Sequence, residues 1–367
     1  MKALVLGGAL VGLLFVLAPG SAKPTTTAAK QIKVVIIGPG TANDQSWDNA
    51  WWDGATRAQR QYGKRVKITF AGGVFTPDKF TSVSSSFASK GYDLIIGVSG
   101  QPPALTLKLA KQFPKTTWCE APFDYVKPSD RLATPPNLCR IDIEQQDGTF
   151  LGGVLAALLT KTKKVVAISG VPYPGATRQL EAFKLGVRCV RSDVEAFDKY
   201  LNSWDDVALG RSSVLSFMES GADIFLASLG QATRGMFEAA KTKPNTYVIA
   251  VNYDAHKQAP SVVLTTILWN VDDITYNVIK QHVNGTFPKH FYKSYNYQNI
   301  RVGEFTPFYA LAKVVPATVR AKFNAIRQAV IAGKIKVPDE TRGSPTIGKV
   351  GSADKIDVKS LGCKPAA

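Results

Sequence analysis

One short segment of the chain concentrates side chains that can recognise a small molecule. Residues 38–54, GPGTANDQSWDNAWWDG, hold three of the six tryptophans together with Asp44, Asp48 and Asp53, and they include no Lys or Arg. Indole rings stack on flat ligands, and carboxylates accept hydrogen bonds from N–H and O–H groups. The segment therefore favours a neutral or cationic planar ligand over an anionic one.

The Gly-x-Gly at the start of this segment also occurs in dinucleotide-binding folds. Asn43 stands where that motif has its third glycine, and carboxylates follow it. A pyrophosphate binds bare backbone N–H groups in a positive potential, whereas this segment supplies negative charge. We therefore expect no nucleotide cofactor and no other cofactor.

A helix is expected to follow the short β-branched run that precedes this segment. Apolar residues recur at helical spacing from Trp51 to Tyr62, which assigns Trp51 to the core rather than to a ligand. Asp44 or Ser46 can accept a hydrogen bond from the first turn as an N-cap. Trp47 lies one turn before Trp51, at the carboxyl end of the strand, where open parallel sheets bind ligands.

Short β-branched runs alternate with helical segments along most of the chain. This alternation is typical of parallel sheets covered by helices. The first series of expected strands comprises residues 33–38, 66–71, 93–98, 116–121 and 137–142, and the second comprises residues 164–169, 195–201, 222–227, 246–251 and 262–268. The two series predict an α/β protein with two Rossmann-like lobes, a hinge and a central ligand cleft.

The first residues have the pattern of a signal peptide, which we assign to residues 1–22. Lys2 precedes an apolar run from Leu4 to Leu17, and small residues follow it. An uncleaved anchor is the alternative, although the run is short for a bilayer core of about 30 Å. Residues 23–32 are expected to be a flexible linker.

Export has consequences for where the protein works and for its cysteines. Cysteine is absent from the first hundred residues, so the acylated cysteine of a bacterial lipoprotein is not available. We expect the protein in the periplasm or otherwise outside the cytoplasmic membrane. Four cysteines in such a protein are expected to form two disulfides.

Three pairings of the four cysteines are possible. Cys119 and Cys139 lie on consecutive predicted strands, which favours a bond between them and leaves Cys189 to join Cys363. The three histidines do not occur at ligand spacing, so no metal site is predicted.

The chain carries a formal net charge of +17. Nucleic-acid binding would require a basic surface of this kind, but we find no dense basic run with interleaved aromatic residues and no nucleic-acid motif. We expect a solvated basic surface, with weak attraction to acidic cell-envelope polymers as its functional alternative. No nucleic-acid partner is expected, and a monomer is expected.

Five segments resemble, in the same order, the basic membrane protein family, whose members are bacterial substrate-binding proteins of ABC importers and include purine nucleoside receptors. NDQSWDNAWWDGA is similar to the family's Asp-x-Ser-Phe-Asn signature. DGTFLGGVLAALLTKTKKVVAISG is similar to its central segment, and LEAFKLGVR, VIAVNYD and IAGKIKVP complete the order. The resemblance runs from about residue 33 to residue 338.

The resemblance implies two lobes that close on a ligand held between them. It assigns residues 31–140 together with 254–286 to the first lobe. It assigns residues 141–253 together with 287–338 to the second lobe. Residues 339–367 then remain as a C-terminal tail.

The resemblance also implies roles for single residues. Trp47 stands where nucleoside-binding members stack an aromatic ring on the base, and Asp48 stands where a polar side chain meets base and ribose edges. A family aspartate corresponds to Asn252 while Asp254 is retained, and a family lysine corresponds to Trp269. Without these charged contacts to ribose, a free nucleobase or a related heterocycle between Trp47 and Trp269 remains open.

Further candidate residues follow predicted strands, and each has an alternative role in a turn or in packing. These candidates are Asn43, Asp44, Ser99, Gln101, Asp124, Tyr173, Trp204, Gly230 and Gln231. The backbone N–H groups of Gly230 and Gln231 start a predicted helix and can bind a ligand oxygen.

These observations predict a binding protein rather than an enzyme. It captures a small, planar, uncharged ligand such as a purine nucleoside, a nucleobase or a related heterocycle, and delivers it to an ABC permease and its ATPase. A ligand-sensing receptor subunit for signalling is the alternative. An extracytoplasmic nucleoside hydrolase has less support, because the sequence has no nucleophile elbow, zinc motif or P-loop, and no catalytic residue is assigned.

Overall fold

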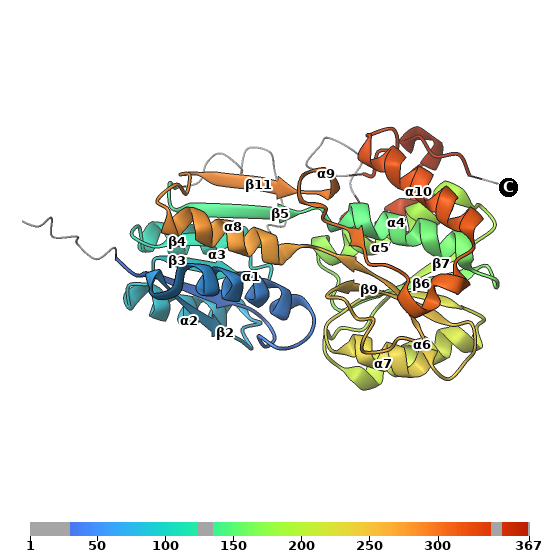
Figure 1. Ribbon diagram of the computed structural model, residues 1–367, viewed down its shortest axis with the longest axis horizontal. Coiled ribbons are helices and arrows are strands. Elements are labelled where there is room, and N and C mark those ends of the chain that lie inside the picture. The colour runs from blue at the N-terminus through green and yellow to red at the C-terminus, as the bar shows by residue number, and fades with distance from the viewer. Residues whose placement is uncertain (1–29, 123–134, 339–346, 366–367) are drawn as a thin grey trace, which may run out of the picture. The chain divides into compact units, whose positions relative to one another are not determined.

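Two six-stranded sheets organise the chain in the computed structural model, which describes residues 30–122, 135–338 and 347–365 (Figure 1). One compact unit begins at Gln31. The predictions for the signal peptide, for most of the linker and for Asp124 concern residues outside the described ranges.

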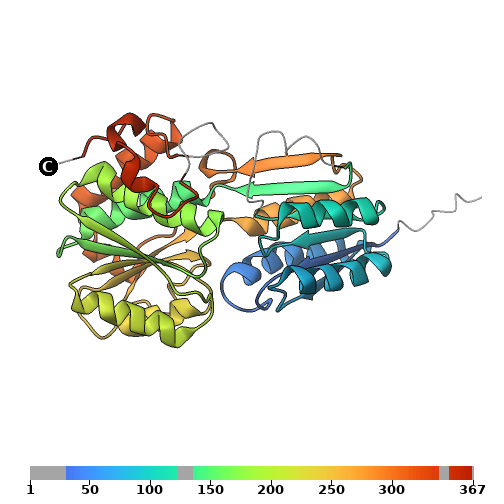
Figure 2. The same ribbon diagram turned by 180° about the vertical axis from the view of Figure 1, so that it is seen from behind.

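The first sheet is fully parallel in the order β11-β5-β4-β3-β1-β2. Its strands are β1 (Ile32–Ile37), β2 (Val66–Ala71), β3 (Leu94–Gly97), β4 (Thr117–Glu120), β5 (Leu138–Ile143) and β11 (Phe291–Tyr295). Helices α1 (Trp47–Tyr62) and α8 (Val271–Val283) cover one face. Figure 2 shows α2 (Pro77–Ser89) and α3 (Pro103–Gln112) over the opposite face.

The second sheet has the order β12-β10-β9-β8-β6-β7 and is parallel except for β12. Its strands are β6 (Lys164–Ser169), β7 (Glu195–Tyr200), β8 (Ile224–Ser228), β9 (Tyr247–Asn252), β10 (Val263–Leu268) and β12 (Glu304–Phe305). Its main helices are α4 (Gln145–Leu159), α5 (Pro174–Val190), α6 (Val207–Glu219) and α7 (Ala232–Ala240). The predicted α/β architecture with two parallel sheets is thus confirmed.

The remaining elements lie mainly in the part of the chain that follows β11. They are the 3-10 helix η1 (Gly63–Arg65), α9 (Tyr297–Ile300), η3 (Tyr309–Val314), α10 (Ala317–Ile331), η5 (Ala353–Lys355) and η6 (Val358–Leu361). Among the described residues, no helix has both the length and the apolarity needed to cross a bilayer.

Small residues let α4 and α5 approach each other closely. A side chain at Gly153 of α4 would come within 2.0 Å of the Phe183 carbonyl oxygen, and one at Gly186 of α5 within 1.9 Å of the Phe150 carbonyl oxygen. Only glycine therefore fits at these two positions. The close contact fixes both helices on one face of the second sheet.

The expected lobe boundaries differ from the observed sheet membership at two strands. Residues 254–286 were assigned to the first lobe, yet β10 pairs with β9 in the second sheet. Residues 287–338 were assigned to the second lobe, yet β11 pairs with β5 in the first sheet. Pairing with β9 holds β10 in the second sheet, and pairing with β5 holds β11 in the first. The chain therefore passes between the sheets after β5, after β10 and after β11.

Both expected disulfides are present. Cys119 and Cys139 lie opposite each other on the neighbouring strands β4 and β5, with their Cα atoms 4.3 Å apart. Cys189 at the end of α5 bonds to Cys363, which lies 174 residues later in the chain.

Residues 347–365 are not a loose tail, contrary to the expectation for residues 339–367. Ile347 and Ala353 are fully buried, and Leu361 is 5% exposed. The low apolar periodicity of this segment gave no sign of this packing, because it is built from single turns rather than from a long helix. The segment folds back onto α5.

A buried carboxylate fixes the C-terminal segment. Glu181 of α5 is 0% exposed and accepts hydrogen bonds from the backbone N–H groups of Gly351 at 2.9 Å and Ala353 at 2.6 Å. The Lys184 ammonium lies 2.8 Å from the same carboxylate. Arg188 donates to the Ala353 carbonyl at 2.7 Å. These contacts hold the segment independently of the disulfide.

Replacing Glu181 is expected to destabilise the protein and to release this segment. Glu181→Ala leaves the backbone N–H groups of Gly351 and Ala353 without their acceptor and leaves the Lys184 ammonium with Asp198 as its remaining carboxylate partner, so we expect the free energy of unfolding to fall by roughly 3 kcal/mol. Urea unfolding and limited proteolysis of the segment measure the effect. Glu195→Ala, at an exposed glutamate of β7, is the control. Equal stability of the two variants would contradict this role.

Candidate ligand-binding site

The loop after β1 is organised by one carboxylate. Asp44 accepts hydrogen bonds from the backbone N–H groups of Ser46 at 2.8 Å, Asn49 at 3.0 Å and Asp48 at 3.2 Å. Asp44 is therefore the group that caps α1, as one of the two expected alternatives. Ser46 instead donates its hydroxyl to the Leu229 carbonyl oxygen at 3.4 Å.

Trp47 is held at the carboxyl end of β3. Its indole N–H donates to the Val98 carbonyl oxygen at 2.7 Å. Its ring meets Trp51 edge to face, with centroids 5.5 Å apart. Trp51 is fully buried, as predicted for a core residue, whereas Trp47 stays half-buried at the rim. The hydrogen bond and the ring contact fix the orientation of the Trp47 indole, which is not among the residues that line the two hollows described below.

Asp48 turns beneath the loop instead of facing outward. It is 1% exposed, and its Oδ2 accepts from the Gly40 N–H at 2.7 Å. A side chain at Gly38 would lie only 1.8 Å from its Oδ1. Burial, and next the negative charge of Asp44, raise the pKa of Asp48 to about 8. In this arrangement Asp48 supports the loop that carries Trp47.

Two loops of the second sheet reach the loop that follows β1. The Gln231 side-chain amide donates to the Asp44 carbonyl oxygen at 2.6 Å, while the Gln231 N–H donates to the Asp205 carboxylate at 3.0 Å. The Asn252 amide donates to the Ser46 hydroxyl at 3.4 Å. The carboxyl edges of the two sheets are thus joined by direct hydrogen bonds.

A small cavity lies among these groups. Its volume is about 20 Å³, which is room for about one water molecule. Asp44, Ser46, Gln231, Arg234, Tyr253 and Gln258 are among the residues that line it. A heterocycle does not fit a cavity of this size while these hydrogen bonds join the two edges.

A wider, open groove of about 580 Å³ lies at the carboxyl ends of β1 and β2. Gly40, Phe70, Gly72 and Phe75 contribute to its walls. A side chain at Gly72 would come within 2.2 Å of the Gly40 carbonyl oxygen, so the two loops meet here backbone to backbone. The groove lies next to the loop that carries Trp47.

Two predicted aromatic residues come together on the second sheet. Trp204 and Tyr173 meet edge to face with ring centroids 6.0 Å apart, and both are half-buried. The Trp204 ring covers Gly170, where a side chain would approach it to 2.3 Å. The Trp204 carbonyl oxygen accepts from Gly230 and Ala232 at 3.1 Å each. This places Trp204 beside the helix start that bonds to the first sheet's loop.

Trp269, another predicted aromatic site residue, is instead a core residue. It is 1% exposed and belongs to the central apolar core. The missing side chain of Gly148 makes room for the ring, since a Cβ there would lie 2.9 Å from it. Trp269 lines neither of the two hollows described above. The expected sandwich of a ligand between Trp47 and Trp269 therefore has no support from this packing.

Asp254 points toward the last part of the chain. It accepts from the Tyr309 hydroxyl at 2.8 Å and from the His256 N–H at 3.1 Å. It does not line the cavity of about 20 Å³.

Three other candidates also lie outside this cavity lining. Gln101 is 7% exposed and donates to the Ser99 hydroxyl at 2.8 Å. Asn43 is exposed and accepts from the Thr41 hydroxyl at 3.1 Å. Of the predicted site residues, the structure brings Asp44, Gly230 and Gln231 together at the cavity.

A group of buried polar side chains at the same strand ends was not predicted from the sequence. Gln179 of α5 donates to the Gln145 side-chain oxygen at 3.0 Å and accepts from the Ser228 hydroxyl at 2.8 Å. All three side chains are at most 6% exposed. In the sequence, the polar run Glu-Gln-Gln-Asp directly after β5 is the feature that could have indicated this group.

Two buried ion pairs continue this group. Arg140 lies 3.6 Å from Glu120, and Arg178 of α5 lies 4.0 Å from Asp142 of β5. All four side chains are at most 5% exposed. The second pair links the first sheet to a helix of the second. Among the described residues, no cluster of His, Cys, Asp or Glu is arranged to hold a metal ion.

The raised pKa of Asp48 predicts a specific pH dependence. Because its folded pKa of about 8 exceeds the ordinary value of 3.8, stability from this group is complete below about pH 4 and is lost as pH rises toward 8. Asp48→Asn stays neutral, so its melting temperature should match the wild type near pH 4 and exceed it at pH 8. Asp78→Asn is the exposed control, and parallel pH profiles of wild type and Asp48→Asn would contradict the assignment.

A family model described as ABC transporter substrate-binding protein PnrA-like (Bmp) matches residues 31–340. Basic membrane protein D of Borreliella burgdorferi is 23% identical over 271 residues, covering 74% of this chain and 76% of that protein. ABC transporter nucleoside-binding protein BmpA of Lactococcus lactis is 24% identical over 328 residues, covering 83% of this chain and 88% of that protein.

Solved structures agree in fold. An ABC transporter solute-binding protein from Aeropyrum pernix superposes with a TM-score of 0.75 at 20% identity, covering 90% of this chain and 98% of the other. One from Conexibacter woesei gives a TM-score of 0.66 at 21% identity, covering 84% of this chain and 98% of the other. The chain therefore belongs to the Bmp family of PnrA-like ABC transporter substrate-binding proteins.

Proposed function

We propose that the protein captures a small, planar, uncharged ligand, either a purine nucleoside, a nucleobase or a related heterocycle, and delivers it to an ABC permease. One observation carries the choice of ligand. The half-buried Trp47 indole is fixed at the rim of the first sheet by a hydrogen bond to Val98. The printed name of the Lactococcus lactis relative, a nucleoside-binding protein, supports the same ligand class.

Charge at the strand ends argues for a neutral ligand. Asp44 and Asp205 lie at the two edges, and their mutual repulsion contributes, after burial, to the raised pKa of Asp44. Arg234 is a cation at the cavity lining. The carboxylates of Asp44 and Asp205 would repel a phosphate, and only the Arg234 guanidinium of the cavity lining would attract it. The N–H and O–H groups of a base or a ribose can instead donate hydrogen bonds to these carboxylates.

Opening and closing of the two halves is the proposed route of ligand entry. Three hydrogen bonds join the edges, from Gln231 to Asp44, from Ser46 to Leu229 and from Asn252 to Ser46. A net contribution of about 1 kcal/mol each makes them easy to exchange for ligand contacts. The three chain passages between the sheets are natural hinges for this motion.

A binding role agrees with the family to which the chain belongs. Substrate-binding proteins of ABC importers are not enzymes, and they work outside the cytoplasm. Binding energy here need only hold the ligand until the permease is reached, and the sum of weak contacts on both sides of a flat ring achieves this.

Trp47→Ala is expected to weaken nucleoside binding at least tenfold, because stacking on a base contributes roughly 1–3 kcal/mol. It should also lower the melting temperature, since the bond to Val98 and the contact with Trp51 are lost. Trp52→Ala is the matched control, because Trp52 lies on the same helix, is half-buried and packs on Phe70. Calorimetry with inosine, adenosine and adenine separates the two effects. Equal affinity in Trp47→Ala would remove Trp47 from the site.

A nucleotide is expected to bind at least tenfold more weakly than its nucleoside. The reason is the carboxylate pair at the strand ends, which repels phosphate. Titration of adenosine and adenosine monophosphate measures the difference. Asp205→Asn should narrow the gap by removing one negative charge. Tighter binding of the monophosphate would overturn the proposed ligand class.

A further inference from the structure

The amino ends of the first sheet's strands carry an unusual excess of positive charge. Because all six strands are parallel, the residues just before them gather on one edge, opposite the ligand edge. The described segments 30–33, 63–67, 89–93, 113–117, 135–138 and 284–291 supply Lys30, Lys33, Lys64, Arg65, Lys67, Lys90, Lys115 and Lys289. They contain a single acid, Asp93. We call this surface the basic edge.

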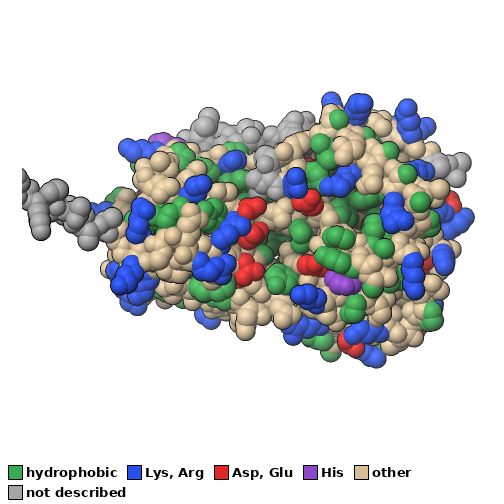
Figure 3. All heavy atoms as spheres, viewed as in Figure 1, with side chains coloured by type: hydrophobic (Ala, Val, Ile, Leu, Met, Phe, Trp, Pro, Cys, Tyr) green, Lys and Arg blue, Asp and Glu red, His purple; other side chains and the backbone are tan. Residues whose placement is uncertain are grey.

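Most of the basic edge is open to solvent. Lys64, Lys67, Lys90, Lys115 and Lys289 are all exposed. Within the described part of the chain, none of these five forms an ion pair. In Figure 3, the end of the molecule where β5 and β11 begin carries Lys and Arg side chains, and no Asp or Glu is visible on that part of the face.

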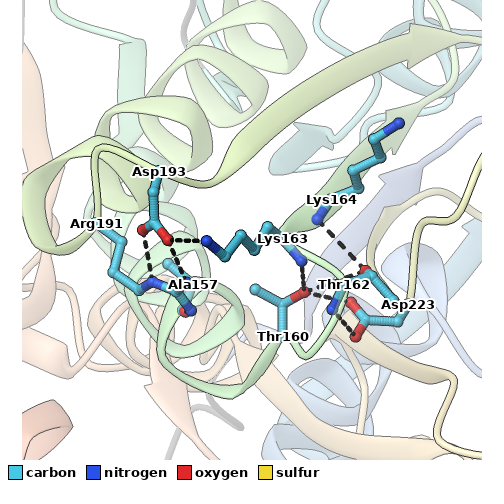
Figure 4. Close-up of polar contacts among 8 residues, drawn as sticks. All are labelled: Ala157, Thr160, Thr162, Lys163, Lys164, Arg191, Asp193 and Asp223. Carbon is cyan, nitrogen blue, oxygen red and sulfur yellow. Dashed lines mark hydrogen bonds and ion pairs between the residues drawn. The ribbon is translucent and has the colours of Figure 1, made fainter. Parts of the chain in front are cut away.

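The corresponding edge of the second sheet is built differently. Just before β7, the carboxylate of Asp193 lies 2.7 Å from Arg191 and 2.9 Å from Lys163 (Figure 4). Its hydrogen bonds, first to Arg191 and then to Lys163, hold its pKa below the ordinary value. Asp223 accepts from Thr160 at 2.6 Å in the same view. At this edge, Arg191 and Lys163 therefore share a carboxylate.

Helix ends alone do not explain the difference between the two edges. Helix C-termini, whose partial negative charge favours Lys and Arg, reach the amino edge of both sheets. Helix ends alone would therefore give both edges the same balance of charge. The first sheet's edge instead lacks the balancing acids. Its six strand ends span roughly 24 Å at ordinary strand spacing, so several cations lie within a Debye length of about 8 Å.

We propose that the basic edge docks on the surface of an anionic phospholipid bilayer. This choice of a bilayer over a dissolved polyanion rests on the proposed function, because delivery of a ligand to a permease brings the protein to a membrane surface. A row of cations roughly 24 Å long at the strand ends also suits a flat anionic surface. Docking through this edge leaves the opposite, ligand-binding edge free. The interaction would hold the receptor close to the membrane while it opens and closes.

Vesicle binding of the protein recovered after export tests the proposal. The edge variant carries Lys64→Gln, Lys67→Gln, Lys90→Gln and Lys115→Gln. The control variant has the same change in charge, with Lys199→Gln, Lys313→Gln, Lys322→Gln and Lys355→Gln at exposed lysines elsewhere. Each protein is sedimented with vesicles of phosphatidylcholine alone and with vesicles of equal parts phosphatidylcholine and phosphatidylglycerol. Thermal melts and nucleoside titration check that both variants remain folded.

We expect binding to the phosphatidylglycerol vesicles only, weakened at least tenfold in the edge variant and changed less than twofold in the control, because each lysine at such a surface adds a several-fold factor. Equal loss in both variants would mean that net charge alone acts, and would overturn the proposal. Equal binding to neutral vesicles would overturn it too. Tighter binding to soluble polyglycerol phosphate at equal phosphate would make the polymer the partner instead of the bilayer.

Discussion

The candidate site depends on the hydrogen bonds that the Asp44 carboxylate accepts from the backbone at the start of α1. Its three hydrogen bonds fix the first turn of α1, and that turn sets the direction of Trp47 and Asp48. The carbonyl of the same residue accepts the Gln231 amide from the second sheet. One residue thus orients the Trp47 ring and also accepts a hydrogen bond from the second sheet, so a movement of this loop affects both contacts at once.

The architecture could be predicted because parallel strands buried on both faces have a strong sequence signal. β1 is fully buried over its last four residues, and such apolar runs stand out from helical periodicity. β11 is an edge strand in which only Phe291 and Tyr295 are buried, so its pattern was too weak to detect. Which sheet β10 and β11 join depends on pairing with strands far away in sequence, and no local pattern contains that information.

The candidate site, like the fold, could be predicted from the sequence only in part. Helical spacing separated the core residue Trp51 from the rim residue Trp47, and position after a strand singled out Asp44 and Gln231, which line the small cavity. Local sequence could not reveal that Asp48 turns beneath Gly38 and Gly40, or that Gly148 lets Trp269 fill the core. These outcomes depend on the space left by other segments. The ion pair between Arg178 and Asp142 joins two sheets and was equally hidden.

The two disulfides differ in when their partners become available to each other. Cys119 and Cys139 are 20 residues apart, whereas Cys189 must wait for Cys363, 174 residues later. In a chain that crosses a membrane amino end first, three thiols emerge well before the fourth. Early closure of the neighbouring pair leaves Cys189 as the sole unmatched thiol, so the order of emergence itself guards against mispairing. The last residues of the chain then complete the half of the molecule that contains the second sheet, when Cys363 bonds to Cys189 of α5.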